Sequence, residues 1–216
     1  LEKWDVHNGI DFRYMFYECS KLKSLDGLEN WNVSNVKSFR YIFAYCNNLK
    51  PLKPLKKWDV SNGKFFSGIF HCCKNIKNLK PLKKWNVSNG IDFNSIFCGC
   101  SNLESLDGLE NWNVSNGMFF DYMFKDCSNL ESLEGLKNWN VKNGNDFKCM
   151  FENCKNIKSL KHLKKWNVSK GENFYFMFCD CQHLISLQPL KNWNLNNRKI
   201  FCDMFRNYLY SLSKKF

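Results

Sequence analysis

The chain has 216 residues, of which 44% are hydrophobic, so it can bury a continuous core and a disordered chain is excluded. Lys and Arg number 32 against 20 Asp and Glu, and the formal net charge of +12 is compatible with acidic partners. No stretch approaches the roughly 18 consecutive apolar residues that a membrane span needs, which excludes a transmembrane helix.

One spacing organises the whole chain: tryptophan recurs every 27 residues, eight times, without an insertion. A fixed period of this size is typical of a solenoid, in which each repeat packs only on its neighbours. We therefore expect residues 1–216 to form a single solenoid domain of eight repeats, and we count offsets within a repeat from its tryptophan. The tryptophans are Trp4, Trp31, Trp58, Trp85, Trp112, Trp139, Trp166 and Trp193.

The first half of each repeat carries apolar residues at helical spacing. Phe occupies offsets 8 and 12, Met or Ile occupies offset 11, and Cys occupies offset 15 in seven repeats, with Tyr208 in the eighth. These offsets are i, i+3, i+4 and i+7, so they predict a short amphipathic helix in every repeat. The preceding V-S-N-G segment offers Ser and Asn as N-caps, and Asn at offset 17, such as Asn102, offers a left-handed C-cap.

The second half of each repeat is apolar but lacks helical spacing. Leu or Ile at offset 18 and Leu at offsets 21 and 24 precede the next Trp, and Gly108 or Pro81 at offset 23 predicts a corner. Short extended segments here would pair with neighbouring repeats in parallel ladders. The predicted fold is an α/β repeat solenoid. Its expected structural core includes Trp31, Trp58, Phe39, Phe43, Cys46, Phe66, Phe70 and Cys73.

The two ends of the array differ. In the eighth repeat Leu195 and Arg198 replace the usual Val and Gly, and the apolar ladder gives way to a polar segment at 210–215. Terminal repeats need a polar outer face, so we expect a C-terminal cap here. Residues 1–4 have the sequence of the tail of a preceding repeat, so we expect the array to continue upstream, with its N-terminal cap missing from this sequence.

The motif W-[ND]-V-S-N-x-x-x-F-x-x-[MI]-F-x-x-C-x-N-L-x-x-L resembles the BspA-like leucine-rich repeat of mycoplasma-type surface lipoproteins. The resemblance covers all eight repeats, although Gly replaces the usual Val or Met after S-N in six of them. It implies a leucine-rich-repeat-like solenoid. It also implies a role in surface display, adhesion or protein–protein contact.

Seven of the twelve cysteines are in register at offset 15. We interpret them as small buried apolar positions, because free Cys packs as a small hydrophobe. A disulfide ladder is the rival interpretation, and the C-x-C pairs Cys98/Cys100 and Cys179/Cys181 leave a zinc site as another. So many thiols favour a reducing, intracellular compartment, or a viral particle, whereas the resemblance favours the cell surface.

No catalytic constellation is visible in the sequence. The four histidines His7, His71, His162 and His183 occupy four different offsets and do not converge on one line of the solenoid. Neither a G-x-S-x-G motif nor a phosphate-binding Gly-rich loop is present. We expect a protein that is not an enzyme and has no catalytic residues, no cofactor and no metal.

Charge is the property that differs most from one repeat to the next. Residues 47–84 contain ten Lys and one Asp, whereas residues 100–136 contain seven acids and one Lys, and lysines return at 155–164. This basic, acidic, basic banding makes the first band a candidate polyanion site, although solvated lysines are the simpler interpretation. Lys lacks the bidentate fork of Arg, so sequence-specific reading of nucleic acid is disfavoured. The candidate binding residues are Lys50, Lys53, Lys56, Lys74, Lys77, Lys80 and Lys83.

Three functional hypotheses follow. The first is a scaffold whose elongated surface binds another macromolecule, most simply a protein. The second is unspecific binding of nucleic acid or another polyanion by the lysine-rich repeats. The third is a structural component of a fibre or coat that associates end to end.

Overall fold

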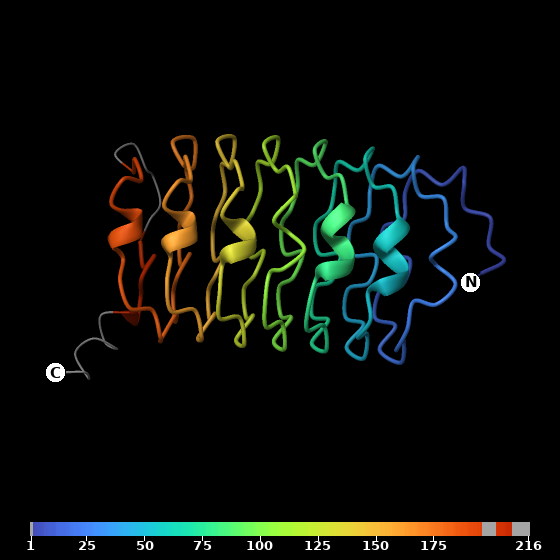
Figure 1. Cartoon of the computed structure of the whole chain (residues 1–216), viewed down its shortest axis with the longest axis horizontal. Coiled ribbons are helices and arrows are strands. Elements are labelled where there is room, and N and C mark those ends of the chain that lie inside the picture. The colour runs from blue at the N-terminus through green and yellow to red at the C-terminus, as the bar shows by residue number, and fades with distance from the viewer. Residues whose placement is uncertain (1, 196–201, 209–216) are drawn as a thin grey trace.

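A computed structural model describes residues 2–195 and 202–208 of the chain. The backbone winds into one row of coils, with the two termini at opposite ends of the row (Figure 1). Each coil corresponds to one 27-residue repeat, and we number the coils 1 to 8 from Trp4 to Trp193. The repeat solenoid expected from the sequence is therefore present. Most of the expected C-terminal cap, at 196–201 and 209–216, lies outside the described residues.

The predicted amphipathic helix at offsets 8–15 is wrong. In every described coil the residues at offsets 10 and 14 have left-handed backbone angles, as in Tyr122 (φ 58°) and Asp126 (φ 60°), which no α-helix allows. Amide groups alternate between two acceptors: Phe124 N donates to Met150 O in the next coil at 2.9 Å, whereas Met123 N donates to Phe120 O at 3.3 Å. The segment is thus a chain of tight turns hydrogen-bonded to its neighbour.

This side of the solenoid, which we call the bridge face, also carries the contacts between coils that are closest to β structure. Isolated parallel bridges join offset 7 of successive coils, from Asp11 and Ser38 through to Asp146 and Asn173. The bridges extend no further along the chain, so residues 2–195 and 202–208 contain no strand. The predicted parallel ladders therefore lie in the opposite half of the repeat from the one where we expected them.

The leucine half forms short 3₁₀ helices instead of extended pieces. Pro54 and Pro81 occupy the second helical position of η1 and η2, where their fixed φ favours the turn and their missing N–H leaves no donor unpaired. Gly108 in coil 4 has a φ of +111° instead, and that coil has no such helix. The helices are η1 (Lys53–Lys57), η2 (Lys80–Lys84), η3 (Glu134–Leu136), η4 (Lys161–Leu163) and η5 (Gln188–Leu190).

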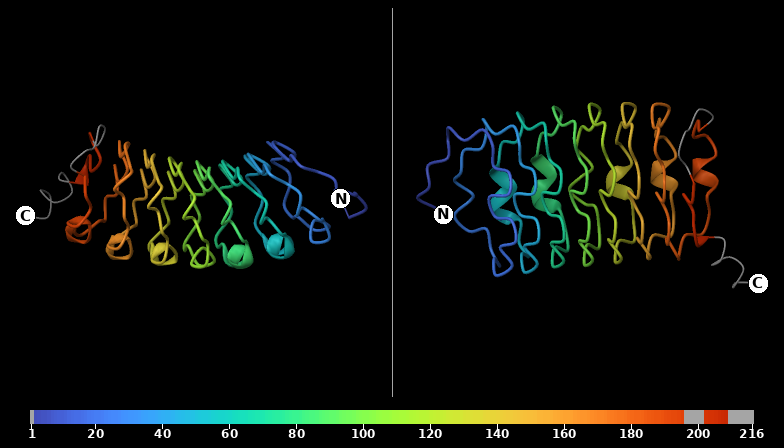
Figure 2. Two further views of the ribbon diagram at one scale, coloured as in Figure 1. Left: turned by 90° about the horizontal axis from the view of Figure 1, so that it is seen from above. Right: turned by 180° about the vertical axis from the view of Figure 1, so that it is seen from behind.

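The 3₁₀ helices line one long side of the row, which we call the 3₁₀ side, and the bridge face lies opposite (Figures 1 and 2). Seen from above, the row bows outward on the 3₁₀ side (Figure 2). None of the helices in the described part of the chain is long and apolar enough to cross a membrane.

The core between the two sides is built from identical rings stacked on one another. Trp rings of adjacent coils lie 6.0 to 6.5 Å apart, and Phe rings at offset 12 lie 5.4 to 5.8 Å apart. In coils 3 to 8 the indole also donates to a backbone carbonyl 30 residues earlier, as Trp85 Nε1 does to Leu55 O at 2.9 Å. The expected core residues Trp31, Trp58, Phe39, Phe43, Cys46, Phe66, Phe70 and Cys73 are all buried here.

The V-S-N segment and Asn at offset 17 do not cap helices. Asn86 Oδ1 accepts the amide of Ser88 at 3.1 Å, which closes an Asx turn at the edge of the solenoid. Asn89 Nδ2 then donates to Ser61 O of the preceding coil at 2.8 Å. At offset 17, Asn48 Nδ2 likewise donates to a carbonyl of the preceding coil, Ser20 O, at 2.8 Å. These asparagines join coils at both edges.

The cysteines at offset 15 make a further contact between coils. The thiol of Cys127 donates to Phe97 O of the preceding coil at 3.2 Å, and the same contact repeats from Cys46 to Cys181. A small buried side chain with a weak donor therefore fits this position. Burial raises the pKa of these thiols well above the usual range in Cys73, Cys100 and Cys127.

This packing predicts three classes of thiol. Cys19 and Cys202 are exposed, Cys72 is half-buried and the other nine are buried. We expect a thiol reagent such as Ellman's reagent to modify Cys19 and Cys202 quickly and Cys72 more slowly, because reaction requires an accessible thiolate. The nine buried thiols should react only after unfolding in guanidinium. Rapid modification of more than three thiols in the folded protein would contradict this packing.

Candidate interaction surfaces

The two long sides of the solenoid present different residues from coil to coil. Offsets 8, 11, 12 and 15 point into the core and are almost invariant, whereas offsets 7, 9, 10, 13 and 14 lie on the bridge face and vary between coils, as at offset 13 from the exposed Tyr17 to the buried Ala44. On the 3₁₀ side, offsets 19, 22 and 25 are outward and mostly charged. Because the core positions are shared by all coils, any specificity must come from these variable positions.

The predicted lysine site lies on the 3₁₀ side. Six of its residues form two exposed rows on coils 2 and 3, which we call the lysine surface, whereas Lys74 lies in the turn between the two sides. The residues of the lysine surface are Lys50, Lys53, Lys56, Lys77, Lys80 and Lys83.

Coil 4 brings carboxylates directly against this surface. Lys77 Nζ lies 3.2 Å from Glu104 Oε1, and Lys83 Nζ lies 2.9 Å from Glu110 Oε1. The hydrogen bond from Lys83 lowers the pKa of Glu110 to about 2. Within residues 2–195 and 202–208, the other four lysines of the surface have no carboxylate within 4.0 Å. The lysine surface thus ends at an acidic coil that neutralises two of its members.

The bridge face carries an aromatic cluster that we did not predict from the sequence. Tyr14 and Tyr41 stack at 5.3 Å between ring centroids, and Tyr17 packs edge-on against both Tyr14 and Tyr45 at 5.4 Å. The ring of His71 continues the cluster at 5.0 Å from Tyr45. Tyr14 is 54% and Tyr17 37% exposed, so the rings form an open surface over coils 1 to 3, which we call the tyrosine patch.

The backbone of coil 3 supports this patch. A Cβ at Gly68, which has a φ of +62°, would lie 2.2 Å from the ring of Tyr41, so glycine there lets the tyrosine lie on the backbone. His71 Nε2 lies 3.2 Å from the Tyr45 hydroxyl. Burial lowers the pKa of His71 and raises the pKa of Tyr45, so both groups stay neutral near pH 7. The patch therefore offers uncharged rings and hydroxyls, with the Glu18 carboxylate hydrogen-bonded to Tyr17 at its edge.

Charged residues follow the patch along the bridge face. The Arg40 guanidinium lies 4.1 Å from the centre of the Phe65 ring and pairs with Asp92 at 3.0 Å. Asp121 lies further along, hydrogen-bonded to Asn94. Burial, and then the nearby charge of Asp146, raise the pKa of Asp121 to about 6, with Asp92 adding to the effect.

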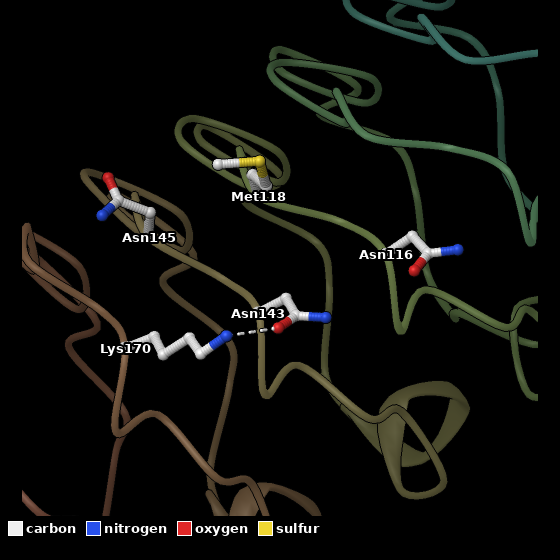
Figure 3. A pocket seen from close by; sticks show the side chains of 5 residues that line it. All are labelled: Asn116, Met118, Asn143, Asn145 and Lys170. Atoms are coloured by element: carbon white, nitrogen blue, oxygen red, sulfur yellow. Dashed lines mark hydrogen bonds between the residues drawn. The ribbon is translucent and has the colours of Figure 1, made fainter.

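A shallow pocket of about 280 Å³ lies at the edge where the V-S-N turns meet the bridge face. Its lining is mostly amide side chains, with the exposed Met118 and with Lys170, whose Nζ donates to Asn143 Oδ1 at 2.8 Å (Figure 3). A nucleophile with an adjacent base is not among the lining residues. The amide and ammonium groups of this lining suit a polar ligand group.

The C-x-C pairs do not form a metal site in the described residues. The thiols of Cys100 and Cys181 donate to Phe70 O and Phe151 O within the core. Over residues 2–195 and 202–208, no group of three or more His, Cys, Asp or Glu side chains is placed to hold a metal ion.

Comparison with known proteins identifies a repeat family. The family model described as "Mycoplasma protein of unknown function, DUF285" matches residues 1–106, 66–183 and 105–214. No curated protein matches the chain. Among solved structures, internalin C2 from Listeria monocytogenes is similar with a TM-score of 0.29 and 13% identity, covering 83% of this chain and 76% of that one. A likeness at this level does not establish a shared fold.

The raised pKa of Asp121 predicts a pH-dependent cost to stability. Its folded pKa of about 6 exceeds the unfolded value, so its favourable contribution is complete at low pH and is lost as the pH rises through 6. We expect Asp121→Asn to raise the free energy of unfolding at pH 7.5 by on the order of 1 to 2 kcal/mol and to have no such effect near pH 4.

Denaturant unfolding at the two pH values measures this difference. Asp107→Asn, an exposed acid on the 3₁₀ side, is the matched control for loss of one negative charge. Equal stabilisation by both variants at pH 7.5 would mean that net charge, rather than burial of Asp121, is responsible.

Proposed function

The chain belongs to the DUF285 family, and we propose that it is a non-enzymatic scaffold that binds a protein partner through its bridge face. The tyrosine patch carries this proposal. Tyrosine is enriched at the energetic centres of protein interfaces because its ring buries a large apolar area while its hydroxyl keeps a hydrogen-bonding group. The resemblance to BspA-like surface repeats supports the same class of function.

The solenoid suits such a role because the patch is held by rigid backbone. Tyr14 N donates to Arg40 O at 3.0 Å and Tyr41 N to Ser67 O at 2.9 Å, so adjacent rings are fixed by the bonds that join their coils. A preorganised surface loses little conformational entropy when a partner binds. Arg40 beside the patch adds the other side chain that is typical of interface centres.

Binding of a long polyanion is less well supported. A phosphate backbone that followed the lysine surface beyond coil 3 would meet Glu104, Asp107 and Glu110 in coil 4. Lys77 and Lys83 are already paired with two of these carboxylates. Counterion release, which drives unspecific binding to nucleic acid, would be limited to two coils.

The proposal predicts that partner binding depends on the tyrosine patch. We expect Tyr14→Ala/Tyr17→Ala to weaken retention of the partner by about tenfold or more, because truncation of a central tyrosine costs on the order of 2 kcal/mol. Quantitative mass spectrometry of proteins retained by immobilised wild type and variant at about 150 mM salt measures the loss, with salt chosen to screen surface charge.

Phe119→Ala is the matched control, because Phe119 is a 40% exposed aromatic residue on the same face in coil 5. Thermal unfolding of each variant tests that the fold is kept. If no retained protein depends on the tyrosines, or if the control loses the same protein, the bridge face near the patch is not the binding surface.

A further inference from the structure

The charges on the 3₁₀ side are arranged in a self-complementary pattern. Coils 2 and 3 are basic, coils 4 and 5 are acidic and coil 6 is basic again at offsets 19, 22 and 25. We propose that two copies of the chain pair antiparallel through this side, about a two-fold axis between coils 3 and 4. Such isologous pairing uses the same surface of both copies and is the commonest symmetry of protein oligomers.

The axis fixes which residues oppose one another. Coil 3 opposes coil 4 of the second copy, coil 2 opposes coil 5 and coil 1 opposes coil 6. The axis lies in the contact plane and runs along the coils, so each coil keeps its direction and every offset opposes the same offset of the second copy. All three pairs in the central row, at offset 22, have opposite charges: Lys80 with Asp107, Lys53 with Glu134, and Asp26 with Lys161.

The two flanking rows, at offsets 19 and 25, follow the same trend. Four of their six pairs are opposite in charge, so seven of the nine pairs are complementary. The two like-charged pairs, Lys56 with Lys137 and Lys23 with Lys158, lie away from the axis. The four complementary flanking pairs are Lys77 with Glu104, Lys83 with Glu110, Lys50 with Glu131, and Glu29 with Lys164.

Neighbouring axes give no such match. An axis between coils 2 and 3 places two lysine rows against each other, with Lys53 opposing Lys80. An axis between coils 4 and 5 places acids together, with Asp107 opposing Glu134. Like charges held this close oppose association, so the charge pattern favours one register and disfavours both adjacent ones.

Ion pairs within one chain hold the side chains at the centre of this surface in place. The Lys77–Glu104 pair at 3.2 Å and the Lys83–Glu110 pair at 2.9 Å hold side chains on either side of the central row. Between them, Lys80 and Asp107 have no ion-pair partner within 4.0 Å in the described part of the chain. The second copy supplies the missing partner for each, and its own two pairs extend the four flanking charges into an alternating network.

The shape of the molecule agrees with contact at this point. The 3₁₀ side bows outward, so two copies meet first at the middle of the row, where the complementary charges are densest (Figure 2). The bridge faces then point away from each other and remain open. Pairing through the 3₁₀ side is therefore independent of partner binding through the tyrosine patch.

Sedimentation velocity of the whole chain tests the proposal. We expect a dimer at about 20 mM salt and protein near 100 µM, and a monomer at about 500 mM salt, because exposed ion pairs are screened. The variants Lys53→Glu/Lys80→Glu and Asp107→Lys/Glu134→Lys should each weaken dimerisation at low salt by about tenfold or more, since four contacts become repulsive. A mixture of the two variants should restore the dimer, because each then opposes the reversed charges of the other.

Lys37→Glu/Lys64→Glu is the control with the same charge change, at exposed lysines beside the bridge face, and it should dimerise like the wild type. Circular dichroism of each variant tests that these exposed substitutions leave the fold unchanged. Three results would overturn the proposal: a monomeric wild type at low salt, including one that binds heparin instead; equal weakening by the control; or no recovery in the mixture.

Discussion

The whole structure depends on bonds from one coil to the next. Coils 1 to 6 each donate backbone amides at offsets 8, 10, 12 and 14 to the following coil, the thiol at offset 15 donates to the preceding coil, and the indole donates to a carbonyl 30 residues earlier. No coil could bury its Phe and Trp rings alone, because a single 27-residue turn has no second layer. The invariant residues are therefore those that face a copy of themselves in the neighbouring coil.

This division leaves the outward residues free for function. The bridge face holds uncharged aromatic rings on rigid turns, and the 3₁₀ side holds long charged chains on short helices. The first arrangement suits a partner that buries apolar area, and the second suits a contact set by charge. One repeat motif thus supports two surfaces of different chemistry, on opposite sides of the same core.

The sequence was sufficient to predict the solenoid and its inward residues, but not the path of the backbone. A chain of turns with a left-handed residue at every fourth position places offsets 8 and 12 on the same side, as an α-helix does. The apolar spacing therefore cannot distinguish these turns from a helix. Gly68, Gly99 and Asn153 at the left-handed offsets were the available signal, since Gly and Asn tolerate positive φ.

Because we expected a helix at offsets 8–15, we did not predict the tyrosine patch. On a helix, offsets 10, 13 and 14 belong to the solvent-facing surface, whereas the turns bring Tyr14, Tyr17 and Tyr45 of two coils together. The charge bands were visible in the sequence because equal offsets stack whatever the backbone does. Individual ion pairs between the bands, such as Lys83 with Glu110, could be identified only from the distance between adjacent coils in the structure.

The most direct test of this account is an NMR measurement of couplings transmitted through backbone hydrogen bonds in coil 5. The structure predicts that the amide nitrogen of Phe124 couples to the carbonyl carbon of Met150, 26 residues ahead in the next coil. An α-helix would instead couple Phe124 to Phe120, four residues back. Coupling to Met150 would establish the hydrogen-bonded turns that join one coil to the next. Coupling to Phe120 would contradict these turns, and with them the bridge face that they form.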